Sequence, residues 1–484
     1  MSEAAATDAN PLFGVETHGF EHIPEAERKM TLRETAFFWV GTNANLFFVS
    51  VGAIAVALGL QIWQAVLACI LGNLLFVLVG YASVAGVRAG LPAMTFTRAT
   101  FGLLGNRPNA LLAWVASVAF EAINTIFGVY ALLALMELLG WQDPGTPGKL
   151  LAVFLQFIVS GGVAVLGHAT MLWFQRIFAV LLSVALVLVF AFSAGDLSWH
   201  VDGALHGSAA LATFTIACAI IASGPISYLY NCPDWVRYLP SQTRSSSVVW
   251  TVTLSGGLTA LLLCIMGALL AGIGDMSDPV AGVKAHVPTW AFLLYTIAAA
   301  GGSIANNVVT YYSSGLALQS MGVPLHRYVA TALDAIVSTG IVLYILFVQD
   351  FTTALNSFVS LLIVWLGPFA GVWIADGLRR RWRYDYRAVH VDVRNGRGTK
   401  YWYWRGINLT NWTAMLAGVV ACLLTVDSPA YVGVLSNAWG GADLSWIVGL
   451  VVGAGSYLLL TRFSQKDLKV EIDLERLHAT EEAK

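Results

Sequence analysis

Charged side chains are scarce in this sequence. They make up 11% of the 484 residues, whereas hydrophobic residues make up 57%. A soluble domain carries about 25% charged residues. The mean hydropathy of +0.71 is correspondingly high. This composition excludes an ordinary soluble protein and predicts a polytopic membrane protein.

Cysteine is also scarce, and the motifs of soluble enzymes are missing. The five cysteines are scattered through apolar segments, and no spacing indicates a disulfide framework or a zinc site. The sequence has no phosphate-binding Gly-Lys-Ser/Thr loop, no His-Glu-x-x-His and no Gly-x-Ser-x-Gly. The nine histidines show no paired ligand spacing inside an apolar run. We therefore expect no metal, no cofactor and no enzymatic activity.

Long apolar runs dominate the rest of the chain. A membrane-spanning helix needs about 20 apolar residues, and the runs predict an all-α protein with twelve such helices. We predict spans at 34–60, 62–84, 109–139, 149–168, 170–193, 210–231, 247–272, 288–316, 328–348, 352–375, 409–425 and 444–461.

The basic residues lie almost entirely on one side of these spans. With both termini inside, 24 of the 26 Lys and Arg fall in inner segments. The positive-inside rule then predicts cytoplasmic termini, in the plasma or inner membrane of the cell. The N-terminus is polar and acidic, unlike a signal peptide. The basic segment 376–408 is expected to lie near anionic lipid rather than to bind nucleic acid.

Two spans contain interruptions that a membrane helix rarely tolerates. The first span has Gly41 to Asn45 at its middle, and the sixth has Gly224-Pro225 within 220–240. Interruptions at matching places indicate an inverted repeat of five plus five helices with a site at its centre. The predicted divisions are 1–33 (N-terminal segment), 34–193 and 210–375 (the two repeats), 376–408 (basic loop), 409–461 (two extra helices) and 462–484 (tail).

Polar and aromatic residues inside the spans are the candidate site. Phe120 and Asn124 are four apart on one helical face and suit a planar heterocycle with amide-like edges. The alternatives are helix or lipid contact for Phe120 and an interhelical hydrogen bond for Asn124. Tyr228 adds a ring with a hydroxyl group, and Asn43 lies at the interruption of the first span.

The eighth span contributes a polar run that includes Asn306, Asn307 and Thr310. The two asparagines project about 100° apart, so they are not expected to face the same ligand. Thr310 lies one turn further on, on the side of this pair. We take Asn307 and Thr310 as the substrate-binding candidates of this span.

Acids inside or beside the spans are candidates for moving a proton. Glu121 lies in the middle of the third span, where a desolvated acid is either a proton carrier or a neutral, hydrogen-bonded structural group. Asp234 is the second candidate, and an ion pair between Asp234 and Arg237 at the inner surface is the alternative for it. Asp334 is expected to be a structural partner.

Four motifs resemble the nucleobase:cation symporter-1 family, in particular its purine–cytosine permease branch. Residues 234–240 (Asp-Trp-Val-Arg-Tyr-Leu-Pro) resemble the family signature after helix 6. Similar likenesses cover residues 15–28 before the first helix, 88–102 after the second and 305–313 in the eighth.

The resemblance implies a leucine-transporter-like fold and symport of a nucleobase or related heterocycle with a proton or a sodium ion. It places the helix 3 aromatic and amide on Phe120 and Asn124, the helix 6 aromatic on Tyr228 and the helix 8 polar position on Thr310. Sodium-coupled members carry hydroxyl residues where this chain has Ile304 and Ala305, which favours a proton.

The sequence therefore predicts a secondary active transporter that imports a nucleobase of the cytosine or purine type, by proton symport, as a lipid-embedded monomer. Asn43, Phe120, Asn124, Tyr228, Asn307 and Thr310 would bind the substrate, with Glu121 and Asp234 coupling the proton. Sodium coupling and other substrates (allantoin or hydantoin, a thiamine precursor, vitamin B6) stay open. So do two other classes: a membrane receptor that does not transport, and a membrane enzyme.

Overall fold

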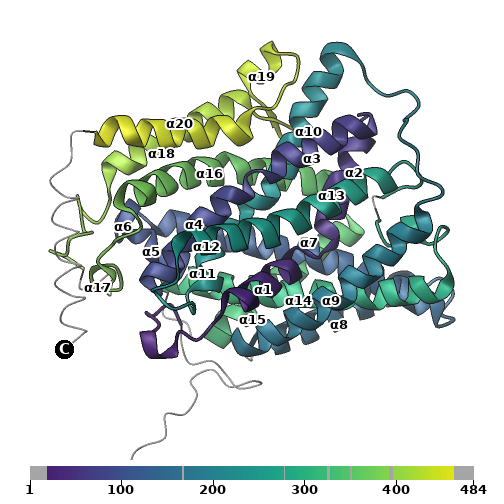
Figure 1. Ribbon diagram of the computed structural model, residues 1–484, viewed down its shortest axis with the longest axis horizontal. Coiled ribbons are helices and arrows are strands. Elements are labelled where there is room, and N and C mark those ends of the chain that lie inside the picture. Colours follow the sequence, from purple (N-terminus) through teal and green to yellow (C-terminus); the bar gives the residue numbers. More distant parts are fainter. Residues whose placement is uncertain are drawn as a thin grey trace, which may run out of the picture.

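The computed structural model describes residues 19–165, 168–276, 278–323, 327–348, 351–391 and 396–462. The long helices run roughly alongside one another (Figure 1). In chain order they are α1 (Leu32–Asn43), α2 (Leu46–Ala57), α3 (Ile62–Asn73), α4 (Phe76–Ala89), α7 (Arg107–Leu138), α8 (Gly145–Val165), α9 (His168–Ser193), α10 (Gly207–Tyr228), α12 (Ser245–Val252), α13 (Leu258–Leu270), α14 (Thr289–Ser320), α15 (Arg327–Phe347), α16 (Phe351–Arg380), α18 (Leu409–Thr425) and α20 (Ser445–Thr461).

Short elements connect the long helices. They are the 3-10 helices η1 (Glu25–Glu27) and η3 (Ala281–Val283), the π-helical turn η2 (Thr253–Gly257), the helices α5 (Ala93–Phe96), α6 (Arg98–Phe101), α11 (Cys232–Val236), α17 (Tyr386–Val389) and α19 (Val434–Ala438), and an antiparallel pair of strands, β1 (Asp427–Ser428) and β2 (Tyr431–Val432).

The predicted all-α membrane fold is confirmed. Within the described ranges, nine helices are long and apolar enough to cross a membrane, and the bent pair α1 and α2 makes a tenth span. The two shorter apolar helices, α18 and α20, fall on the predicted spans 11 and 12. The helix pattern is therefore consistent with twelve spans.

The first span breaks where the sequence predicts. Helix α1 ends at Asn43, and α2 restarts at Leu46 at an angle of 49°. The side chain of Asn45 accepts a hydrogen bond from the backbone N–H of Phe47, which caps the second half of the span. Its amide group also donates to the carbonyl of Thr42 at 2.7 Å. One asparagine thus satisfies backbone groups on both sides of the break.

The sixth span breaks later than the sequence predicts. Helix α10 continues through Gly224 and Pro225 to Tyr228. The chain then turns tightly at Leu229 to Asn231 before α11 begins at Cys232. Placing the interruption at Gly224-Pro225 is therefore wrong by about one turn. The reason is that membrane helices tolerate an internal proline when neighbouring groups and local adjustments satisfy the backbone.

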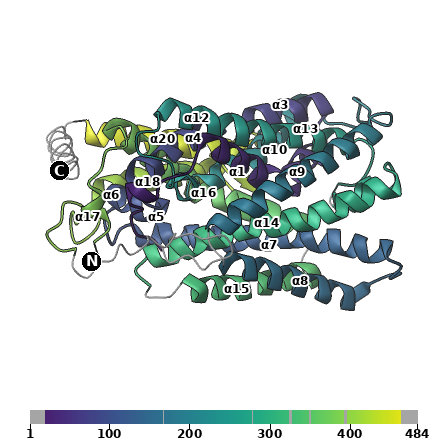
Figure 2. The same cartoon turned by 60° about the horizontal axis from the view of Figure 1, so that its bottom comes forward.

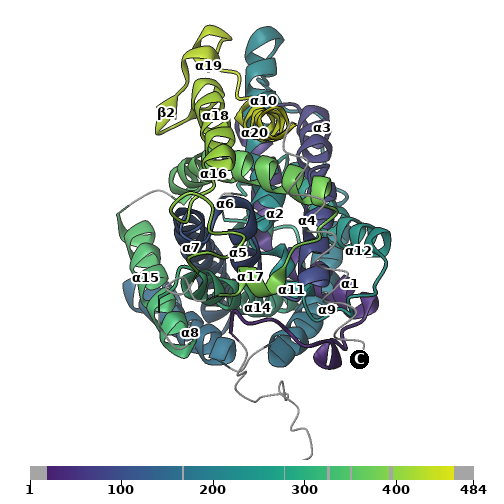
Figure 3. The ribbon, with the colours of Figure 1, turned by 90° about the vertical axis from the view of Figure 1, so that its left-hand side faces the viewer.

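Helix packing shows the inverted repeat. Helix α9, the fifth span, packs against α1 and α14, whereas α16, the tenth, packs against α10 and α7. Span 5 thus touches spans 1 and 8 as span 10 touches spans 6 and 3. Helices α7 and α14 pack along each other, and α8 and α15 cover them as an outer layer (Figures 2 and 3).

Helices α2 and α13 approach each other closely at glycines. A Cβ atom on Gly52 would lie 1.9 Å from the carbonyl oxygen of Cys264. A Cβ atom on Gly267 would lie 1.9 Å from the carbonyl oxygen of Val49. In lipid, where helices gain little from hydrophobic burial, such small residues allow the backbones to make van der Waals contact.

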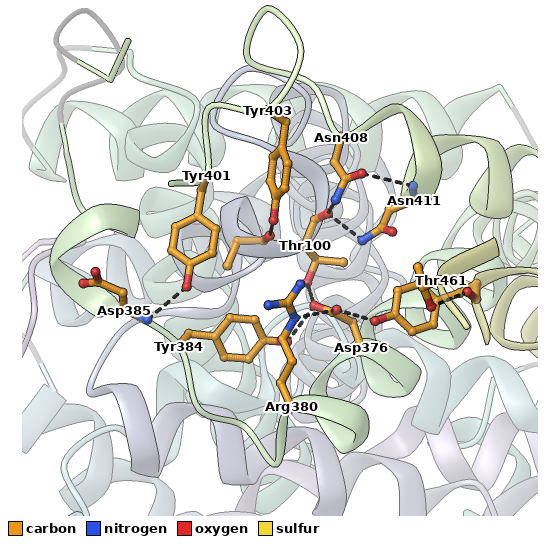
Figure 4. A network of polar contacts seen from close by, with 12 residues as sticks. Thr100, Asp376, Arg380, Tyr384, Asp385, Tyr401, Tyr403, Asn408, Asn411 and Thr461 are labelled. Atoms are coloured by element: carbon orange, nitrogen blue, oxygen red, sulfur yellow. Dashed lines mark hydrogen bonds and ion pairs between the residues drawn. The ribbon is translucent and has the colours of Figure 1, made fainter. Parts of the chain in front are cut away.

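The C-terminal helices are fixed to α16 by a buried network around Asp376 (Figure 4). Its carboxylate accepts hydrogen bonds from Tyr457 of α20 at 2.6 Å, Tyr384 at 2.7 Å and Thr100 of α6 at 2.9 Å. It also pairs with Arg380 at 2.8 Å. Helix α16 extends to Arg380, five residues past the predicted end of the second repeat at 375.

The segment Gly19–Met30, here called the N-terminal strap, crosses the end of the bundle at which α4, α11 and α16 terminate. We call this end, which carries Arg88 and Arg379 to Arg381, the basic end. The strap hydrogen-bonds through Ile23 N–H to the carbonyl of Gly90 and through Met30 N–H to that of Tyr238. Within the strap, Arg28 is buried and donates to the carbonyl of Val87 at 3.0 Å.

Two aromatic stacks join the strap to the loop after α16. The ring of Phe20 stacks on His390, with centroids 5.1 Å apart, and His22 stacks on Tyr386 at 4.4 Å. Burial, followed by the nearby guanidinium of Arg98, lowers the pKa of His390. The basic segment is therefore packed against the protein at these residues as well as exposed to solvent at others.

Candidate substrate site

A narrow cavity lies between the two helix breaks at the centre of the bundle. Its free volume is about 30 Å³, which is about the space of one water molecule, so the lining side chains nearly fill it. The α1–α2 junction, α2, α7, α10, α11 and α14 all contribute. The cavity is lined by Thr42, Asn45, Phe47, Phe48, Phe120, Asn124, Gly224, Ser227, Tyr228, Tyr230, Asn231, Trp235, Asn306, Val309 and Thr310.

Four of the predicted residues meet at this cavity: Phe120, Asn124, Tyr228 and Thr310. The side-chain amide of Asn124 makes no hydrogen bond with any residue that the structure describes, although its backbone carbonyl accepts one from Ser303 at 2.5 Å. The hydroxyl of Thr310 is engaged with the carbonyl of Asn306. Asn124 therefore brings a complete amide, donor and acceptor, to the cavity wall.

The other predicted residues lie elsewhere. Asn43 donates to the carbonyl of Trp39 within its own helix, and Asn307 donates to Thr125 of α7 at 2.8 Å. Neither is among the lining residues, and the same is true of Glu121 and Asp234. The structure thus places two of the six substrate-binding candidates and both proton candidates outside the cavity wall.

The rotation of α14 about its own axis determines which of its two adjacent asparagines faces the cavity. Asn306 and Thr310 are four residues apart and share the face that lines the cavity, whereas Asn307 is turned by about 100° toward α7. Asn306 also donates to the carbonyl of Thr42 at 3.1 Å, across the break of the first span. The sequence argument separated the two faces but chose the wrong asparagine for the cavity.

The late break of the sixth span brings Tyr230, Asn231 and Trp235 to the cavity, and sequence reasoning missed all three. Trp235 lies 5.5 Å from Tyr228 between ring centroids and 5.0 Å from Trp39. An aromatic cluster therefore forms one side of the cavity. The only sequence signal was the high aromatic content of 228–238.

The basic end of the cavity is closed by side chains that link α11 and its C-terminal flank to α14. The indole N–H of Trp235 donates to Ser313 at 3.1 Å, and Arg237 donates to the hydroxyl of Tyr312 at 2.7 Å. Arg237 also donates to the carbonyl of Gly19 in the N-terminal strap. Asp234 accepts a hydrogen bond from the backbone N–H of Ala93 at 2.7 Å. Spans 2, 6 and 8 and the strap thus meet at the basic end of the cavity.

Gln175 of α9 fills the space where α1, α9 and α14 meet. Its amide donates to the carbonyl of Ala305 at 2.8 Å, and its side chain lies against Gly41. Over the described ranges, no cluster of three His, Cys, Asp or Glu side chains could hold a metal ion.

The repeat, the paired breaks and the central cavity define the class of protein: a membrane transporter built from two inverted five-helix repeats. A family profile described as "Permease for cytosine/purines, uracil, thiamine, allantoin" matches residues 22–449. The chain therefore belongs to this permease family, as its motifs predicted, and it is a transporter rather than an enzyme.

Individual relatives agree with this assignment. The chain is 26% identical over 469 residues to YxlA of Bacillus subtilis, whose name assigns it provisionally to the purine–cytosine permeases; the match covers 93% of this chain and 96% of YxlA. It is 25% identical to the allantoin permease of the same organism, over 91% and 92% of the two chains. The solved structure of Mhp1, a nucleobase-cation-symport-1 family transporter in a closed conformation with bromovinylhydantoin bound, shares the fold with a TM-score of 0.74 at 19% identity, over 93% and 95% of the chains.

Proposed function

We propose that this protein imports a nucleobase of the cytosine or purine type, or a closely related planar heterocycle, together with a proton. The observation that carries the proposal is the Asn124 amide, which faces a cavity between Phe120 and Tyr228 without a hydrogen-bond partner among the described residues. A nucleobase presents a matching donor and acceptor along one edge and an apolar face for aromatic contact.

The same wall also suits a ring with fewer polar edges. The two polar side chains that the eighth helix brings to the cavity are both engaged, because the hydroxyl of Thr310 donates to the carbonyl of Asn306 and the amide of Asn306 donates to the carbonyl of Thr42. A hydantoin or allantoin ring, with one amide-like edge to satisfy, is therefore the second candidate substrate. The names of the allantoin permease and of the hydantoin permease of Microbacterium maritypicum support the same alternative.

The junction of α1, α9 and α14 supports a proton rather than sodium as the coupling ion. A hard cation needs several oxygen ligands to replace its water (a rule stated for calcium and magnesium and extended here to sodium). Ile304 and Ala305 offer no side-chain oxygen, and an N–H group of Gln175 already occupies the carbonyl of Ala305. The basic end would face the cytoplasm, as the positive-inside rule requires.

Reconstituted proteoliposomes test this proposal. An imposed inward proton gradient should drive uphill accumulation of the substrate, and an imposed sodium gradient at constant pH should not. A thermal-shift screen of cytosine, hypoxanthine, uracil, allantoin and hydantoin identifies the ring, since a ligand that binds only the folded state raises apparent stability. Binding without accumulation under any gradient would refute transport and indicate a receptor.

A further inference from the structure

Two buried acids lie behind the cavity wall, one on α7, a helix of that wall, and one on α15, which packs against α7 and α14. Glu121 of α7 and Asp334 of α15 are both fully buried. Ser314 of α14 lies beside both carboxyl groups, and α7 packs along α15. Neither acid forms an ion pair with any residue in the described part of the chain. Two such charges without a cation are very unfavourable in a low-dielectric interior.

The surroundings of the two acids are unequal. Asp334 accepts hydrogen bonds from the indole N–H of Trp114 and from Ser314, whose oxygen lies 2.5 Å away. Both oxygens of Glu121 lack a hydrogen bond of good geometry from any described residue, although Ser314 and Ser338 lie beside them. Two donors stabilise the charged form of Asp334, while burial without donors favours the neutral form of Glu121. Paired acids in such unequal environments divide the acid and base roles between them.

We propose that Glu121 and Asp334 form a dyad that binds a single proton, held on Glu121 beside the charged Asp334, and that this is the proton coupled to substrate uptake. The inference rests on the proposed proton symport and deepens it, because it assigns the proton site. It replaces Asp234, whose carboxylate is fixed by the backbone of Ala93 at the basic end of the bundle.

A hydrogen-bonded pair of hydroxyl groups reaches from the cavity lining to the face of α7 that carries Glu121. The hydroxyl of Tyr230, a lining residue, lies 3.0 Å from that of Ser117. Ser117 is one helical turn from Glu121 on α7, on the same face.

The dyad is linked to two helices of the site: Glu121 lies on α7, and Ser314 of α14 donates to Asp334. Glu121 follows Phe120 directly, and Ser314 is one turn from Thr310 on α14. A change in the position of α7 or α14 on substrate binding would therefore alter the surroundings of the proton. The titratable groups that face Glu121 are Asp334, Tyr311 and Tyr230, with Asp234 beyond Tyr230.

Two transport assays, substrate counterflow and proton-driven accumulation, distinguish a defect in the dyad from a defect in the substrate site. The variant Glu121→Gln keeps the shape of the acid but cannot release a proton. In proteoliposomes it should retain substrate counterflow, an exchange that needs no net proton movement, within about threefold of wild type. It should lose more than tenfold of the accumulation driven by a proton gradient and of the substrate-dependent proton flux. The matched control is Asp443→Asn, another buried acid in the loop before α20, and it should retain both activities.

The outcomes distinguish this inference from the proposed function. If wild-type protein accumulates substrate without moving protons, proton symport itself is refuted. If wild type moves protons and Glu121→Gln moves them equally, only the dyad is refuted.

Should Glu121→Gln fail to fold, Asp334→Asn provides the second test. Without the charge at 334, the proton is held less tightly, so the pH of half-maximal uptake should shift to a lower value. An unchanged pH profile would overturn the inference.

Discussion

Replacing Asn124 with alanine should weaken substrate binding strongly while leaving the protein folded. The side-chain amide makes no hydrogen bond to the described protein, so the substitution removes none of the bonds that hold the helices together. It does leave one donor and one acceptor of the bound ring facing a methyl group.

The magnitude follows from the number of groups left unpaired. Each buried polar group without a partner costs about 1–3 kcal/mol, and two groups therefore cost about 2–4 kcal/mol if the vacated space is partly rehydrated. Since 1.4 kcal/mol corresponds to about a factor of ten in affinity, we expect the dissociation constant to rise about 30- to 700-fold.

The assay is equilibrium binding of radiolabelled substrate to purified protein, with the melting temperature measured on the same samples. Asn73→Ala is the matched control, because Asn73 is a buried asparagine of the second span that donates to the carbonyl of Cys69 at 2.9 Å. It should lower the melting temperature more than Asn124→Ala does and leave affinity within about threefold. A dissociation constant within twofold of wild type for Asn124→Ala would refute the assignment of the site.

Three further predictions concern the framework around the site. Asp376→Asn removes the charge that four groups from α6, α16, α20 and their flanks share. It should destabilise the protein by about 3–5 kcal/mol, as breaking a buried pair does. A melting temperature equal to wild type would contradict this. Gly52→Val should abolish the folded peak on fluorescence-detected size exclusion, because the new side chain meets the backbone of α13. The control Gly161→Val, with no atom within 4 Å of its Cβ, should elute normally. Equal elution profiles for the two variants would refute the close contact. Because burial against the strap lowers the pKa of His390, protonation opposes the stacking of Phe20 on His390. The stacked arrangement is therefore favoured above about pH 6.5, the ordinary value for histidine, and weakens as the pH falls below it, so hydrogen exchange at the Ile23 N–H, which bonds to the carbonyl of Gly90, should accelerate on acidification relative to a His390→Gln variant measured at each pH. A constant ratio between the two proteins would show that His390 is not responsible.

The predictable parts of this fold follow from short-range rules. The break of the first span could be predicted because glycine and two asparagines in the middle of a membrane helix must satisfy backbone groups that lipid cannot. Likewise Phe120 and Asn124 share one face wherever their helix packs, because they lie four residues apart.

The errors arose where a long-range contact decides between local alternatives. Pro225 is as compatible with a continuous helix as with a break. The turn at 229–231 shows that the helix continues through Pro225 and breaks after Tyr228. Asn306 and Asn307 are adjacent in sequence, and the position of α7 determines which of them faces the cavity. Trp235 reaches the site because α11 begins only at Cys232, and no periodicity in the sequence predicts that start.

The N-terminal strap has a consequence for synthesis. Its residues near Phe20 are among the first to be made, yet the ring that covers Phe20 belongs to His390. At a translation rate of about 5–20 residues per second, about 20–70 seconds separate the two. During that interval the strap can already bond to Gly90 and Tyr238, but its two ring stacks cannot form. A chain truncated before Tyr386 never forms them, so the stacked pairs distinguish a finished protein from an incomplete one.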